Sequence, residues 1–121
     1  MGPQTLAPLR FIGLDVHKFY LIAVGVDAQL NEIFGPVRVP LAQLEPWMQK
    51  NLTPQDAVVL EMTTNAFQLY DDLLPYAGSV TLVHPPHVAL ITRARVMTDK
   101  LAARLLARLL AAGLLPPVWV P

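Results

Sequence analysis

Two carboxylates stand in apolar surroundings and could do chemistry together. Asp15 interrupts the almost wholly apolar run 10–17, and Glu61 ends a second apolar run, 58–61. An ionised carboxylate in an apolar strand is costly unless it is paired or binds a metal ion. Asp99 adds a third acid where a helical pattern begins. Hard divalent cations prefer oxygen ligands and assist phosphoryl transfer, so these three acids predict a Mg²⁺ or Mn²⁺ site.

Each carboxylate also has a simpler interpretation. Asp15 could be held by backbone amides, Glu61 could cap the following helix, and Asp99 could be a plain N-cap. Acids at the ends of neighbouring strands lie where open α/β folds place their ligands. One shared site therefore explains the three positions better than three separate structural roles.

The first half of the chain predicts an antiparallel meander. Apolar, β-rich runs predict strands over 10–17, 19–26 and 33–39, with a turn at 27–31. Gly35 and Pro36 in the third run indicate a bulge or an edge position. Short links between the three strands favour antiparallel pairing.

The second half alternates between strands and helices. The pattern predicts a helix over 40–51, a strand over 57–61, a helix capped near 63–65, a strand over 79–83, and helical structure over 87–112 with a break near 96–98. Gly113 can end the last helix. This order predicts an α/β fold with a mixed five-stranded sheet, in which strand–helix units follow the meander. Residues 1–9 read as a flexible arm or an expression remnant.

Composition limits the classes of protein. The 121 residues are 54% hydrophobic and contain no cysteine, which excludes disulfides and thiolate metal sites and fits the cytoplasm. We find no signal peptide and no apolar run long enough to span a membrane. The apolar surplus favours a homo-oligomer.

The zero net charge hides an asymmetry. Residues 1–83 hold four basic and eight acidic residues, whereas residues 84–121 hold five basic residues and one acid. A basic C-terminal third can face phosphates, although a solvated cationic helix face is an equal alternative. The candidates for nucleic-acid contacts are Lys18, Arg93, Arg95, Lys100, Arg104 and Arg108.

Four segments resemble motifs of the DEDD-type ("one-ten") insertion-sequence transposases. These are Gly13–Lys18, Leu60–Thr63, His84–Val88 and Thr98–Ala107, and Trp119–Pro121 is similar to the segment that closes the family's catalytic domain. The resemblance covers residues 10–121 and implies a ribonuclease-H-like, RuvC-like domain. It also implies DNA as substrate, contact with a structured guide RNA, and an oligomer in the full protein.

The chain departs from this family in two ways. The family has a fourth acid three residues after the third, and Ala102 stands there, so we expect Asp15, Glu61 and Asp99 to bind metal weakly. Nothing here corresponds to the family's C-terminal serine domain. We therefore expect a nuclease-type transposase core that is inactive or impaired.

Two other classes of protein compete with this interpretation. The same fold could be a non-catalytic nucleic-acid-binding or dimerisation module. A sugar-kinase-like or actin-like nucleotide-binding domain also opens on a strand with Gly-x-Asp, but Phe19 and Tyr20 stand where its phosphate loop needs small residues.

Overall fold

The computed structural model describes residues 8–61, 66–83 and 99–115, with side chains from residue 102 onward in the last range. The elements follow the predicted order: β1 (Arg10–Val16), β2 (Tyr20–Val26), β3 (Glu32–Pro40), the 3₁₀ helix η1 (Leu41–Gln43), α1 (Leu44–Asn51), β4 (Asp56–Glu61), α2 (Ala66–Leu73), β5 (Ser79–Val83) and α4 (Asp99–Ala111). The predicted helix over 40–51 thus begins as a 3₁₀ turn.

The sheet has the predicted mixed topology. Its five strands lie in the order β3-β2-β1-β4-β5. The β1–β2 and β2–β3 pairs are antiparallel, and β4 pairs in parallel with both β1 and β5. An antiparallel meander continued by parallel strands in this order is the ribonuclease-H-like topology. It places β1, which carries Asp15, at the centre of the sheet.

Strand β3 is an irregular edge strand, as Gly35 and Pro36 predict. Its register against β2 shifts between the pairs that involve Ala23, Gly25 and Val26. Gly35 has φ +80°, and a Cβ there would lie 2.4 Å from the carbonyl oxygen of Ala23. Only glycine therefore fits this position without moving the backbone.

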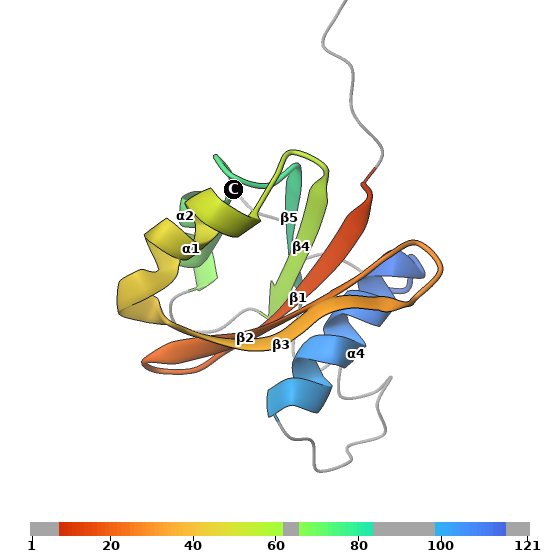
Figure 1. Cartoon of the computed structure of the whole chain (residues 1–121), viewed down its shortest axis with the longest axis horizontal. Helices are drawn as coiled ribbons and strands as arrows, with labels where there is room; N and C mark the ends of the chain where they lie inside the picture. Colours follow the sequence, from red (N-terminus) through yellow and green to blue (C-terminus); the bar gives the residue numbers. More distant parts are fainter. Residues whose placement is uncertain (1–7, 62–65, 84–98, 116–121) are drawn as a thin grey trace, which may run out of the picture.

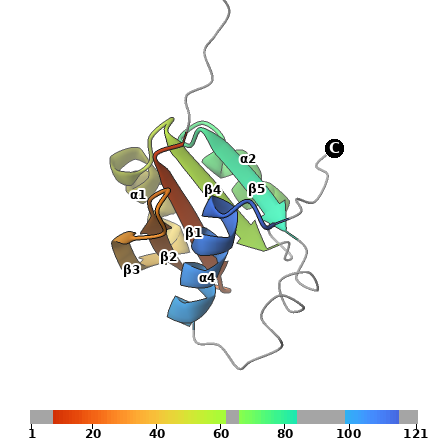
Figure 2. The same ribbon diagram turned by 90° about the vertical axis from the view of Figure 1, so that its right-hand side faces the viewer.

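Helices cover both faces of the sheet. Figure 1 shows α1 and α2 on one face and α4 on the other, and Figure 2 shows the same layers from the side. The larger core lies under α1 and α2, where Ile12, Leu14, Val58 and Leu60 are fully or almost fully buried. Smaller clusters on the α4 face join Leu106 to Val59 and Val83, and Ala103 to Ile22 and Val24.

Helix α4 crosses β1 at very short range because β1 has glycine at the crossing. A Cβ on Gly13 would lie 2.1 Å from the carbonyl oxygen of Ala103 and 2.7 Å from the nitrogen of Ala107. The helix ends as predicted at Gly113, which has φ +72°. The amide of Leu114 donates to the carbonyl of Leu109 at 3.0 Å, a pattern typical of a glycine-terminated helix.

Some predictions fall outside the described residues. They concern most of the arm over 1–9, the helix cap at 63–65, and the whole segment 84–98 with its basic residues Arg93 and Arg95. No helix in the described part of the chain is long and apolar enough to cross a membrane.

Candidate metal and nucleic-acid site

Asp15 and Glu61 come together on the α4 face of the sheet. The parallel register pairs Gly13 with Val59 and Leu14 with Leu60, so Asp15 and Glu61 follow as the next neighbours along β1 and β4. Side chains alternate along a strand, and Asp15 therefore shares a face with Gly13, as Glu61 does with Val59. That is the face on which Gly13 and Val59 contact α4. Two carboxylates thus converge near the carboxyl ends of adjacent strands.

The surroundings of this acid pair disfavour its double negative charge. Burial raises the pKa of Glu61 above its ordinary value, and the negative charge of Asp15 raises it further. Both effects disfavour the ionised form of Glu61. A cation between the two carboxylates would remove the repulsion and replace the lost hydration. The electrostatics of the pair therefore fit a metal ion.

His17 orients the Asp15 carboxylate. Its Nε2 lies 2.7 Å from Oδ2 of Asp15, and the carboxylate accepts this hydrogen bond. The imidazole stacks on the ring of Tyr20, with 4.7 Å between the centroids and 15° between the planes. The guanidinium carbon of Arg38 lies 4.1 Å from the Tyr20 ring centroid. A row of His17, Tyr20 and Arg38 therefore runs from Asp15 across β2 to the β3 edge.

The third predicted acid begins α4, as the sequence indicates. Figures 1 and 2 agree that the N-terminal end of α4 lies at the carboxyl end of β1. Helical spacing places position 99 on the same side as Ala103 and Leu106, which pack on the sheet. Ala102, at the position of the expected fourth acid, is half-buried in the first turn. Among the side chains that the structure describes, no group of three acids or histidines could hold a metal.

The predicted phosphate-contacting cations have different surroundings. Arg104 donates two hydrogen bonds to Glu32, at 2.6 and 3.0 Å, and Arg108 lies 3.8 Å from the same carboxylate. The bonds with Arg104 lower the pKa of Glu32. Lys18 is exposed beside the ring of Phe19. Phosphate contact by Lys18, Arg104 or Arg108 stays a prediction, and the side chains of Arg93, Arg95 and Lys100 lie outside the described residues.

The sequence reasoning missed the row formed by His17, Tyr20 and Arg38. One signal was available for His17: it lies two residues from Asp15 in a strand, so both side chains share a face. The contacts of Tyr20 and Arg38 depend on the register that pairs Ile22 with both Asp15 and Arg38, and no local pattern specifies that register.

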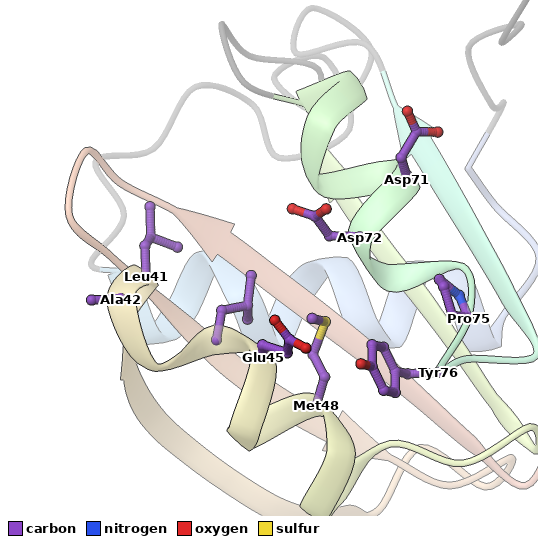
Figure 3. A pocket seen from close by; sticks show the side chains of 9 residues that line it. Leu41, Ala42, Glu45, Met48, Asp71, Asp72, Pro75 and Tyr76 are labelled. Carbon is purple, nitrogen blue, oxygen red and sulfur yellow. The ribbon is translucent and has the colours of Figure 1, made fainter.

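A separate cavity of about 460 Å³ lies between α1 and α2, on the opposite face of the sheet from the acid pair. Figure 3 shows Glu45 of α1 and Asp71 and Asp72 of α2 around it, with the apolar side chain of Met48 among the lining residues. Because the sheet separates it from Asp15 and Glu61, this cavity is not part of the candidate metal site.

Replacing Glu61 with glutamine is expected to raise the melting temperature at pH 7. The pKa of Glu61 is raised in the folded protein, so the unfolded chain ionises this carboxyl more readily than the folded protein does. The folded protein therefore loses stability as the pH increases above the ordinary pKa of glutamate, about 4.3. The melting curves of wild type and Glu61→Gln should converge below that pH. Thermal melts between pH 3.5 and 8 without divalent ions measure this. A variant less stable than wild type at pH 7 would contradict the electrostatic account.

No family model matches the chain, and no curated protein sequence matches it either.

Proposed function

We propose that this chain is the nuclease-type core of a DNA transposase or recombinase that acts on DNA phosphodiester bonds with Mg²⁺ or Mn²⁺, and that it is catalytically impaired at Ala102. The observation that carries the proposal is the convergence of Asp15 and Glu61 on adjacent parallel strands of a ribonuclease-H-like sheet. The negative charge of Asp15 is the second cause, after burial, of the raised pKa of Glu61, and a cation between the two carboxylates would relieve that repulsion.

Each residue has a distinct part in the proposed site. Asp15 and Glu61 are the metal ligands from the sheet, and Asp99 is the ligand from the first turn of α4. His17 is a positioning residue, because its hydrogen bond fixes the orientation of the Asp15 carboxylate. When bound, the metal would activate the attacking hydroxyl and stabilise the leaving oxygen of the phosphodiester.

Ala102 accounts for the proposed impairment. A residue three positions after Asp99 lies on the same helix side, about one turn away. An acid at that position would add a fourth carboxylate to the same site. Alanine removes that charge while keeping the helix, since it has the highest helix propensity.

Replacing Ala102 with aspartate is therefore expected to tighten Mn²⁺ and Mg²⁺ binding about tenfold or more, because affinity for these ions increases with the number of charged ligands. Asp15→Asn should lose measurable binding. Ala112→Asp is the matched control, since it makes the same substitution at an exposed position beyond the other end of α4. Titration calorimetry measures the affinities, and nicking of supercoiled DNA with Mn²⁺ measures activity.

The same experiment separates the second candidate function, a non-catalytic nucleic-acid-binding or dimerisation module. The alanine at position 102 favours this alternative. If Ala102→Asp and Ala112→Asp bind metal equally, and neither nicks DNA, the metal-site proposal fails and the binding module remains.

A further inference from the structure

A groove of about 420 Å³ follows the β3 edge of the sheet, between that strand and α1. Two exposed cations, Arg38 of β3 and Lys50 of α1, line it together with the half-buried indole of Trp47. Its other lining residues are uncharged: Val37, Val39, Pro40, Gln43, Pro46 and Asn51. The groove therefore combines two positive charges and an aromatic ring with no negative charge.

The two cations of the groove belong to the part of the chain that is otherwise acidic. Residues 1–83 contain only four basic residues against eight acids. Arg10 is bound to Asp56, so two of the other three cations lie in this groove. The cavity between α1 and α2 is instead lined by three acids. The two hollows beside α1 thus have opposite charge, and the β3 groove is the one suited to a polyanion.

The groove is connected to the acid pair by side chains in contact. Arg38 lines the groove and also lies over the Tyr20 ring, Tyr20 stacks on His17, and His17 bonds to Asp15. The groove lies on the α1 side of the β3 edge, whereas Tyr20 lies on the α4 side, where it packs against Ile22, Val24 and Ala103. A nucleic acid strand that leaves the groove therefore reaches the acid pair by passing round the β3 edge, where Arg38 lies. The Tyr20 ring itself is covered by His17 and by the Arg38 guanidinium, so bases stack elsewhere than on this ring.

We propose that the β3 groove binds single-stranded DNA, with phosphates at Arg38 and Lys50 and a base against Trp47. Beyond Arg38 the strand passes round the β3 edge toward Asp15 and Glu61 on the α4 side of the sheet. The choice of DNA, and its course to the acid pair, rest on the proposed function. Binding in the groove itself requires neither a metal ion nor catalysis.

An extended peptide that adds to the β3 edge is the main competing occupant. Such a partner needs a row of backbone donors and acceptors on the edge strand. Pro36 and Pro40 lie in β3 and have no N–H group, which interrupts that row. Together with the two cations, this favours a phosphate backbone over a peptide strand.

The test is the anisotropy of a labelled single-stranded oligothymidine, titrated with the full chain in EDTA at several salt concentrations. Arg38→Gln and Lys50→Gln should each weaken binding several-fold and reduce the slope of log affinity against log salt by about 0.7, the value for one lost phosphate contact. Arg38→Lys should retain the slope. Gln29→Glu is the control, because it makes the same change in net charge in the exposed turn at the other end of β3.

Fluorescence gives a second readout. In a Trp119→Phe variant, Trp47 is the only indole. Oligothymidine should quench the fluorescence of Trp47 in this variant, but not when Arg38→Gln and Lys50→Gln are added to it. Thermal melts establish that each variant folds. Wild-type affinity and slope in the double variant would overturn the proposal, as would equal or tighter binding of duplex DNA or of RNA of matching sequence. Because EDTA is present, failure of the metal site leaves this result unaffected.

Discussion

Replacing Gly13 with alanine is expected to destabilise the protein by about 3 kcal/mol or more and to displace α4 from the sheet. Overpacking a core typically costs about 1–3 kcal/mol, even where flexible side chains can yield. Here the new methyl group would lie 2.1 Å from a backbone oxygen and 2.7 Å from a backbone nitrogen of α4. Neither atom can move without the helix. Urea unfolding measures the loss, and hydrogen exchange of the α4 amides reports the displacement.

Gly113→Ala is the matched control for this substitution. Gly113 has positive φ, but no atom lies within 4 Å of the position of its Cβ. The expected cost is about 1–2 kcal/mol, the strain of a left-handed conformation, with the exchange of central α4 amides unchanged. If Gly13→Ala is no more destabilising than Gly113→Ala, the close crossing of β1 and α4 is wrong.

The displacement also has a functional consequence under the proposed function. Helix α4 begins at Asp99, and its N-terminal end lies at the carboxyl end of β1. Moving the helix would displace position 99 relative to the carboxyl ends of β1 and β4. We therefore expect Gly13→Ala to weaken Mn²⁺ binding in any fraction of the protein that remains folded.

Replacing Arg10 with methionine is expected to cost about 3–5 kcal/mol, the range for removing one partner of a buried ion pair. Asp56 is 1% exposed, and Arg10 donates to both of its carboxylate oxygens, at 2.7 and 2.6 Å. Arg10 also donates to the carbonyl oxygen of Asn51 at 2.6 Å. Methionine retains much of the buried stem but leaves the carboxylate uncompensated. Chemical denaturation of the variant measures the loss.

A double-mutant cycle tests whether the uncompensated charge is the cause. Asp56→Asn keeps an oxygen for the amide of Thr53, which lies 2.8 Å from Oδ2 of Asp56. The double variant Arg10→Met/Asp56→Asn should then lose less stability than the two single variants combined. Strict additivity would mean that the cost of Arg10→Met comes from lost packing and the bond to Asn51.

Local sequence patterns were enough to predict most of the elements that the structure describes. Apolar β-rich runs and helical spacing predicted the strands and helices, and Gly113 correctly predicted the end of α4. Short links between the first three strands predicted their antiparallel pairing. These predictions succeed because hydrophobic period, chain reversal and helix termination depend on residues only a few positions apart.

The candidate site was only partly accessible to the same reasoning. The cost of a carboxylate in an apolar run singled out Asp15 and Glu61, because that cost depends on the immediate neighbours. Their convergence depends on the parallel register of β1 with β4, which the sequence does not specify residue by residue. The raised pKa of Glu61 follows first from its burial and then from the negative charge that this convergence brings near it.

By itself, the sequence determined which residues form each element and which carboxylates are costly, because both properties are local. The tertiary structure decided which distant groups meet. It paired Arg104 with Glu32 across 72 positions, and it aligned His17, Tyr20 and Arg38 between Asp15 and the β3 groove. It also brought α4 against Gly13. Such contacts depend on strand register and on the packing of helices against the sheet. Both are established only when the whole hydrophobic core has formed.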